Sequence, residues 1–239
     1  MTEKKKSIFA LIFRIFGLLT GITAITLQAV ANSNVEDGFM VNHIFAYFTV
    51  QTNIFTTIIF LLLIIKTIVD FVKTKSLQVS SIYPSLHLGC TFYITITMIV
   101  YWTALATTVG LPKNPLLISN NLFLHLFTPL CAIIDCIFFF KHGSVNKKDA
   151  FKWLIYPVLY LISVVIIANV SDLPYYSFEM NGKVINLMYP YPFLDPQIVT
   201  VGGMVGIIFL LLFVFILFGL AYVKIDNLIY KKQKKKIEK

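Results

Sequence analysis

Six long apolar segments follow one another along the chain, and short polar stretches separate them. An α-helix rises about 1.5 Å per residue, so about 20 apolar residues cross the hydrocarbon core of a bilayer. The pattern therefore predicts an all-α polytopic membrane protein, a six-helix transmembrane bundle formed as a single domain over residues 1–239. The predicted spans are residues 8–31, 44–70, 82–109, 120–140, 151–170 and 198–223, and a basic tail at residues 224–239 follows them.

The composition agrees with a lipid environment. Hydrophobic residues make up 58% of the 239 residues and charged residues only 13%, and the mean hydropathy is +0.82. A soluble domain has about twice that share of charged residues. The apolar surface is thus large enough to face lipid. Only the lysine-rich stretch at residues 231–236 is predicted to lack ordered structure.

Basic residues alternate between the loops. They gather in four segments, which contain Lys4, Lys5 and Lys6; Lys73 and Lys75; Lys141, Lys147, Lys148 and Lys152; and the tail from Lys231 to Lys239. The first loop carries Glu36 and Asp37, the third only Lys113 and the fifth only Lys183. By the positive-inside rule, this pattern predicts a cell-membrane protein with cytoplasmic N- and C-termini.

The net charge of +9 is therefore a signal of topology. It does not indicate nucleic-acid binding, because the basic residues are scattered over four segments without interleaved aromatic residues. The expected partner is the bilayer itself, with anionic lipid headgroups beside the basic tail.

The first apolar segment has a second interpretation. A basic start, an apolar stretch and Ala29-Val30-Ala31 match a secretory signal peptide with an A-x-A cleavage site. Cleavage would leave five spans and the same topology for the rest of the chain. The length of the segment and the presence of Arg14 within it favour a retained span.

Polar residues form faces on two of the predicted spans. Thr49, Thr52 and Asn53 share one helical face of the second span, and Asn121 and His125 share one face of the fourth. Thr49 and His125 lie at similar depth, each about five residues inside its span. A hydroxyl nucleophile and its base require such proximity. Ordinary hydrogen bonding between helices is the alternative interpretation of the same residues.

Tyrosines on two further spans also have both a functional and a structural interpretation. Tyr101 aligns with Thr97 on the third span, and Tyr160 aligns with Tyr156 and Ser163 on the fifth. They are candidates to line a cavity. Interfacial anchoring is the commoner use of tyrosine in membrane proteins.

Arg14 and Asp135 are the deepest charges of the predicted bundle. They match in depth and oppose in sign, so they are predicted to form a structural ion pair. A proton or ion relay is the alternative, although one pair does not make a chain across the membrane. Gly202 and Gly206 form a GxxxG pair on the last span, which predicts a close packing face.

The sequence shows no metal-binding pattern. Its three cysteines lie inside apolar segments, and there is no CxxC motif or Cys/His cluster. No metal and no organic cofactor is expected.

Three sequence strings carry a resemblance to known families. They are Phe48-Thr49-Val50-Gln51-Thr52-Asn53, then Leu124-His125 followed by Pro129 and Asp135, then Tyr189-Pro190-Tyr191-Pro192-Phe193-Leu194-Asp195. Over nearly the whole chain they resemble a family of bacterial six-span membrane proteins of unassigned function. More distantly they are similar to the androgen-induced-gene family, which includes intramembrane threonine hydrolases of fatty acid esters of hydroxy fatty acids.

This second resemblance implies a catalytic pair of Thr49 and His125. The chain is then expected to hydrolyse a lipid-like ester, with Thr49 as the nucleophile and His125 as the base. Gln51 or Asn53 would donate to the oxyanion. The other residues expected around the substrate are Thr52, Asn121, Tyr101 and Tyr160. The alternatives are a membrane transporter or binding protein for a lipid or small molecule, or a scaffold; the absence of an internal repeat disfavours a transporter.

Overall fold

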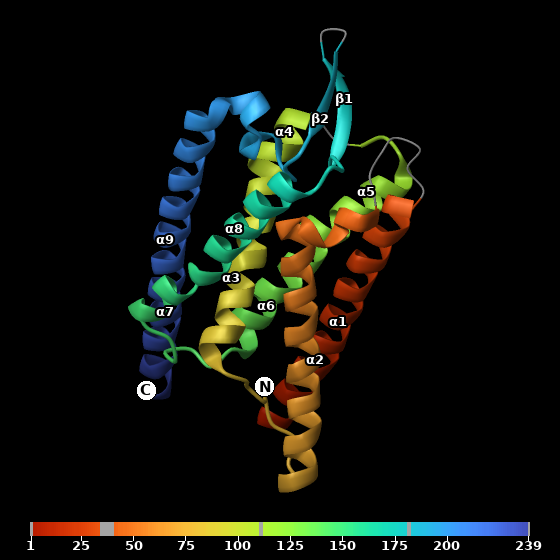
Figure 1. Cartoon of the computed structure of the whole chain (residues 1–239). Helices are drawn as coiled ribbons and strands as arrows, with labels where there is room; N and C mark the ends of the chain where they lie inside the picture. Colours follow the sequence, from red (N-terminus) through yellow and green to blue (C-terminus); the bar gives the residue numbers. More distant parts are fainter. Residues whose placement is uncertain (1, 34–40, 110–111, 181–182, 239) are drawn as a thin grey trace. The chain divides into compact units, whose positions relative to one another are not determined.

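The structure is a computed structural model that describes residues 2–33, 41–109, 112–180 and 183–238 (Figure 1). The chain divides into two compact units, Met1–Ala31 with Phe48–Val145 and Asn32–Tyr47 with Asn146–Lys239. The acidic residues Glu36 and Asp37 of the first loop lie outside the described residues.

The first unit is a bundle of helices. It contains α1 (Glu3–Ser33), α2 (Phe48–Thr74), α3 (Pro84–Val100), the π-helical turn η2 (Tyr101–Leu105), α4 (Ala106–Val109), α5 (Pro115–Leu122), the π-helical turn η3 (Phe123–Phe127) and α6 (Thr128–Phe139). Proline occupies the first turn of α3 and α5, where its missing N–H has no helical partner to lose. Within the unit, α3 packs against both α2 and α6.

The second unit is also mainly helical. It contains the 3₁₀ helix η1 (Val41–Ala46), α7 (Lys147–Lys152), α8 (Ile155–Val170), a hairpin of β1 (Tyr176–Met180) and β2 (Lys183–Leu187), the 3₁₀ helix η4 (Pro192–Leu194) and α9 (Pro196–Ile237). The strands are antiparallel, and their register pairs Tyr176 with Leu187 and Met180 with Lys183. The sequence analysis did not predict this hairpin.

Six helical segments are long and apolar enough to cross a membrane, which confirms the prediction of six long apolar helices. They are Glu3–Ser33, Phe48–Thr74, Pro84–Leu105, Pro115–Phe139, Lys147–Val170 and Pro196–Lys236. The second begins four residues later than predicted, because residues 44–46 belong to η1. The fifth combines α7 and α8, which meet at Trp153 and Leu154.

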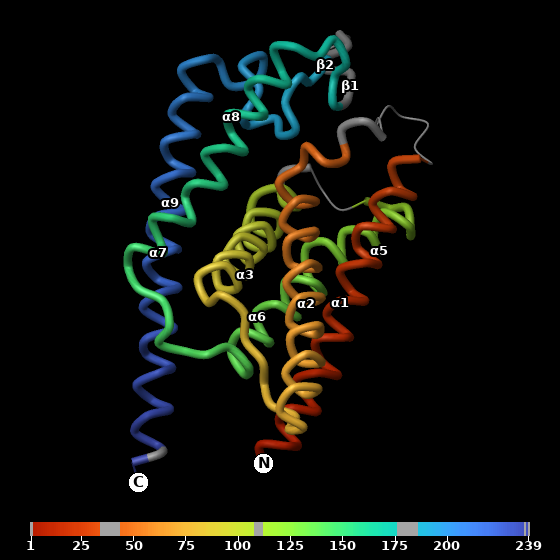
Figure 2. The backbone as a smooth tube through the Cα atoms, turned by 60° about the horizontal axis from the view of Figure 1, so that its bottom comes forward, coloured from red at the N-terminus to blue at the C-terminus, as the bar shows by residue number. Residues whose placement is uncertain are grey.

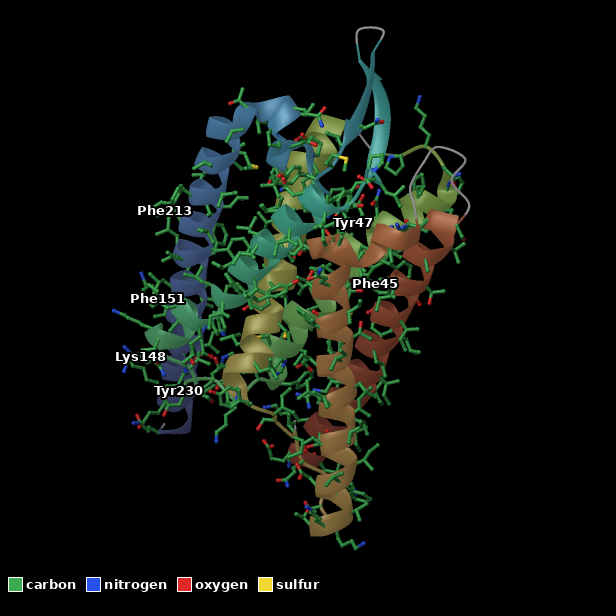
Figure 3. The ribbon with its side chains drawn as sticks, in the orientation of Figure 1. Phe45, Tyr47, Lys148, Phe151, Phe213 and Tyr230 are labelled. Carbon is green, nitrogen blue, oxygen red and sulfur yellow. The ribbon has the colours of Figure 1, made fainter. Side chains whose placement is uncertain are left out.

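Large apolar side chains point away from the helices of the second unit (Figure 3). Phe45, Phe151 and Phe213 are each more than half exposed, at 63%, 54% and 56%. Exposed aromatic side chains at this density would be unfavourable in water but suit a lipid environment. Phe151 and Phe213 lie within the fifth and sixth of these segments and support their assignment as spans.

The basic tail is helical. Figure 2 follows α9 along its course to the C-terminal end of the chain. The helix continues to Ile237, and its last turn carries Lys234, Lys235 and Lys236. The prediction that residues 231–236 lack order is therefore wrong, since they continue a helix already formed by the apolar span, and propagation costs less than nucleation.

Two glycines let α1 approach α2 closely. A Cβ atom at Gly21 would lie 2.1 Å from Thr57 Oγ1, and one at Gly17 would lie 2.6 Å from the Phe60 ring. By contrast, a Cβ atom at Gly202 or Gly206 would meet nothing within 4 Å. Within the second unit, nothing described packs against the face predicted on α9, and in the first unit the GxxxG pair on α1 packs closely.

Candidate functional site

The buried amide of Asn53 joins the two segments that carry the candidate pair. Its Nδ2 donates to the carbonyl oxygen of Thr49 at 2.9 Å and to that of Leu124 at 3.1 Å. These bonds hold the first turn of α2 against η3, where His125 follows Leu124. The residues expected from the sequence to come together, Thr49 and His125, therefore lie on adjoining segments of the first unit.

The two hydrogen bonds donated by Asn53 change the expectation that it donates to an oxyanion. A side-chain amide has two N–H donors, and both are engaged by carbonyl oxygens here. Asn53 has no donor left for an oxyanion in this arrangement. Gln51, the other oxyanion donor expected from the sequence, lies partly buried on α2.

The hydroxyl of Thr49 differs from those of its neighbours. The helix α2 has six threonines, and five of them donate the hydroxyl to a backbone carbonyl three or four residues earlier. These five are Thr52, Thr56, Thr57, Thr67 and Thr74. Thr49 Oγ1 makes no such bond within the described residues, and its side chain is only partly buried. Its hydroxyl is thus available for another partner.

The His125 ring is held on two sides. It stacks on Tyr101 with ring centroids 3.6 Å apart and planes 11° from parallel. Its Nδ1 lies 3.2 Å from the carbonyl oxygen of Asn121. Since a carbonyl oxygen only accepts, Nδ1 carries the proton in this contact, and Nε2 keeps its lone pair. A neutral imidazole with a free Nε2 lone pair is the form that acts as a base.

Two π-helical turns face each other at this site. Tyr101 begins η2 and His125 lies within η3, and Trp102 Nε1 donates to the His125 carbonyl oxygen at 2.9 Å. A π-turn leaves a backbone carbonyl without its usual i+4 partner, so a side chain can bond to it. The Asn53 side chain bonds to the Leu124 carbonyl in this way. The His125 carbonyl lacks its i+4 donor because residue 129 is proline, and Trp102 bonds to it instead.

No hydrogen bond joins Thr49 to His125 among the described residues. Catalytic hydrogen bonds are often long in an enzyme without substrate and tighten when substrate binds. Thr52 Oγ1, next on the same face, contacts Thr97 Oγ1 at 3.0 Å and so ties α2 to α3. Tyr160 belongs to the second unit, where its hydroxyl donates to the Ala46 carbonyl oxygen at 3.0 Å.

The ion pair expected from the sequence is present. Arg14 Nε donates to Asp135 Oδ1 at 2.8 Å, and both side chains are almost completely buried. Arg14 Nη1 also donates to the Ser80 carbonyl oxygen at 2.9 Å. On the other side, His87 Nε2 lies 3.3 Å from Asp135 Oδ2. The pair and His87 therefore form a cluster of three ionisable residues, called the charged cluster below.

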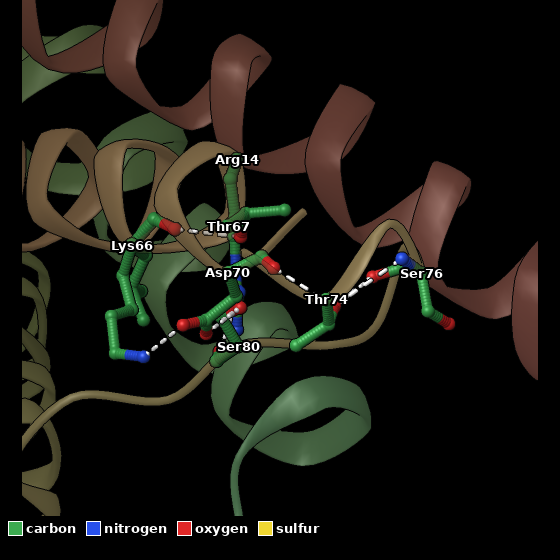
Figure 4. Close-up of polar contacts among 8 residues, drawn as sticks. Arg14, Lys66, Thr67, Asp70, Thr74, Ser76 and Ser80 are labelled. Carbon is green, nitrogen blue, oxygen red and sulfur yellow. Dashed lines mark hydrogen bonds and ion pairs between the residues drawn. The ribbon is translucent and has the colours of Figure 1, made fainter. Parts of the chain in front are cut away.

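The charged cluster continues toward one end of α2 (Figure 4). Ser80 Oγ donates to Asp70 Oδ2 at 2.7 Å, and Asp70 Oδ1 pairs with Lys66, which is exposed. These contacts connect the loop before α3 to both α1 and α2. They fix the position of a loop that has no regular secondary structure of its own.

Sequence reasoning missed His87 and the role of Trp102. His87 is an ionisable residue inside a predicted span, and this feature alone marks a residue for attention. Pro129 lies four residues after His125 and has no N–H, so the sequence does indicate that the His125 carbonyl needs another donor. That Trp102 is this donor depends on how the two π-turns pack, which side-chain periodicity does not reveal.

The fold and the site define a multi-pass α-helical membrane protein with two buried polar clusters in its first unit. Comparison with protein-family models, with curated proteins and with solved structures finds no match for this chain.

Proposed function

We propose that the protein is an intramembrane hydrolase of a lipid-like ester, with Thr49 as nucleophile and His125 as base. The observation that carries the proposal is the Asn53 bridge, which joins the turn bearing Thr49 to the segment bearing His125. The uncommitted Thr49 hydroxyl and the Nε2 lone pair of His125 supply the two groups that the chemistry needs. The resemblance to intramembrane threonine hydrolases agrees with this choice of residues.

The reaction would proceed in two steps. Thr49 Oγ1 attacks the ester carbonyl while His125 Nε2 takes its proton, and the alcohol leaves with that proton. A water molecule then attacks the threonine ester, again with His125 as the base, and releases the fatty acid and free Thr49. Gln51 is the proposed donor to the negatively charged oxygen of each tetrahedral intermediate.

The proposed orientation follows from the basic residues. Both termini lie in the cytoplasm, and the turn bearing Thr49 lies near the outer surface of the cell membrane. A lipid ester would then enter sideways from the outer leaflet. The lysines at the end of α9 would attract anionic lipid headgroups on the cytoplasmic side.

A fluorophosphonate probe tests the nucleophile directly, because it reacts with activated hydroxyls. We expect the purified protein in liposomes to be labelled and to hydrolyse a p-nitrophenyl fatty acid ester. Thr49→Val keeps the shape of the side chain and removes the hydroxyl, so labelling and hydrolysis should both be lost. His125→Ala should have the same effect, and the double variant should be little worse than either single one.

Thr67→Val is the matched control. Thr67 lies on the same helix and is buried, and its hydroxyl donates to the Leu63 carbonyl oxygen away from the site. This variant should keep both labelling and hydrolysis. If the folded wild-type protein is not labelled, or if Thr49→Val keeps full activity, the hydrolase proposal is wrong and a lipid-binding or transport role is favoured.

A further inference from the structure

The charged cluster has hydrogen-bonding capacity that the described residues do not use. Asp135 Oδ2 and Arg14 Nη2 are buried and have no hydrogen-bond partner within the part of the chain that the structure describes. His87 Nε2 is 3.3 Å from Asp135 Oδ2, but this contact does not have hydrogen-bond geometry. Of the three residues of the cluster, only His87 lines the neighbouring cavity, so a water molecule there reaches the cluster at His87.

A small cavity adjoins the cluster on the His87 side. Its volume is about 10 Å³, which is close to the space that one water molecule needs. The cavity is lined by Thr56, Ile59, Phe60, His87, Cys90, Thr91 and Ala132. All seven residues belong to the first unit.

The lining of the cavity is polar enough to keep water. Thr56 Oγ1 donates to the Thr52 carbonyl oxygen at 2.9 Å, and Thr91 Oγ1 donates to the His87 carbonyl oxygen at 3.1 Å. Each hydroxyl oxygen therefore keeps its lone pairs for a donor from the cavity. Cavities that stay dry are lined by apolar groups only, whereas a water with two to four polar partners is retained.

We propose that this cavity is a binding site for one internal water molecule, which hydrates the charged cluster through His87. The water donates to the hydroxyl oxygens of Thr56 and Thr91 and contacts the His87 ring. His87, positioned by the water on one side and Asp135 on the other, then completes the environment of the ion pair. The site is independent of Thr49 and His125 and does not rest on the proposed hydrolase activity.

Nuclear magnetic resonance of the protein in nanodiscs tests the site. With ¹³C-methyl alanine and threonine, a bound water gives a cross-peak to the methyl group of Ala132, which lines the cavity. Ala24 is also buried and is not part of the lining, so its methyl group is the internal control. We expect a water cross-peak at Ala132 and none at Ala24.

A pair of matched variants tests the partners. Thr91→Val removes one of the two proposed acceptors at constant shape and should abolish the water cross-peak at Ala132. Thr67→Val makes the same change in a buried threonine outside the lining and should leave the cross-peak unchanged. The absence of a water cross-peak at the Ala132 methyl group in the wild type, or an unchanged cross-peak in Thr91→Val, overturns the proposal. The wild-type measurement decides it even if Thr91→Val does not fold.

Discussion

The imidazole of His125 lies flat on the phenol ring of Tyr101, with the ring centroids 3.6 Å apart and the planes 11° from parallel. The two residues come from different π-turns, so the stack joins η2 to η3. Stacking on one face and the Nδ1 contact to Asn121 together restrict rotation of the ring. The stack therefore sets the direction of the Nε2 lone pair.

The Tyr101 stack makes a prediction about ester hydrolysis. Tyr101→Leu should lower kcat with little change in KM. The His125 ring can still accept a proton, but it is no longer held in the orientation that the reaction needs. An aromatic pair contributes about 0.5–1.5 kcal/mol, so kcat should fall by roughly 2- to 12-fold. Tyr101→Phe keeps the ring and should keep kcat. Equal loss in both variants would mean that the hydroxyl, and not the stack, is what matters.

The Arg14–Asp135 pair makes a prediction about stability. Asp135→Asn leaves the Arg14 charge buried without a counter-charge, which should lower the free energy of unfolding by about 3–5 kcal/mol. The joint change Arg14→Met with Asp135→Leu should recover much of this loss, as measured by thermal unfolding in detergent. Lys66→Met breaks the exposed pair with Asp70 and should cost at most about 1 kcal/mol. Simple additivity of the two buried changes would contradict the pairing.

The contact between α1 and α2 makes a prediction at Gly21. Gly21→Ala places a methyl group 2.1 Å from Thr57 Oγ1, so the helices must separate and stability should fall by about 1–3 kcal/mol. Adding Thr57→Ala removes the clashing oxygen and should restore part of the loss. Gly202→Ala is the control, since nothing lies within 4 Å of the new atom. Thermal unfolding that ranks Gly202→Ala as the more harmful change would contradict the close approach.

The basic residues make a prediction about topology. Asp172 and Ser144 are exposed on either side of the fifth span. A membrane-impermeant maleimide added to intact cells should label Asp172→Cys and not Ser144→Cys. The three native cysteines are buried, so the wild type should give a low background. Labelling of Ser144→Cys from outside would show that the protein has the opposite orientation in the membrane.

Tyr175 makes a prediction about alkaline pH. It lies between α8 and β1, outside the spans, and burial raises its pKa to about 12. In the unfolded chain the phenol ionises near pH 10, so between about pH 10 and 12 the unfolded state loses protons that the folded state keeps. Stability should therefore be intact below pH 10 and fall as the pH rises toward 12. Tyr175→Phe should show a smaller fall, measured by unfolding at fixed temperature, and an identical fall would exclude Tyr175 as its source.

Local sequence was sufficient for the spans and for one tertiary contact. A run of about 20 apolar residues is stable in a bilayer only as a helix, whatever surrounds it, so the six spans follow from the sequence. Arg14 and Asp135 could be paired because a buried charge in lipid needs a counter-charge and each was the deepest of its sign. Both inferences depend on the solvent and not on packing.

The tertiary structure decided which polar residues meet. Depth along the spans aligned Thr49 with His125, but the two π-turns and the Asn53 bridge depend on how α2 packs on the neighbouring helices. The same packing adds His87 to the ion pair. Hydrogen bonds across helices require a rotation of each helix about its axis, and apolar spans that are hydrophobic on all faces do not specify that rotation.

Two pairs of glycines show most simply what the sequence determines and what the tertiary structure adds. Gly17 and Gly21 on α1 and Gly202 and Gly206 on α9 have the same four-residue separation. Among the described residues, a helix presses against the α1 pair at Thr57 and Phe60, and nothing in the second unit lies within 4 Å of the added atom at either glycine of the α9 pair. The sequence by itself determined the apolar spans and the positions of small and charged residues along them. The tertiary structure determined which of these faces is in contact, because contact depends on the neighbouring helix as much as on the residue itself.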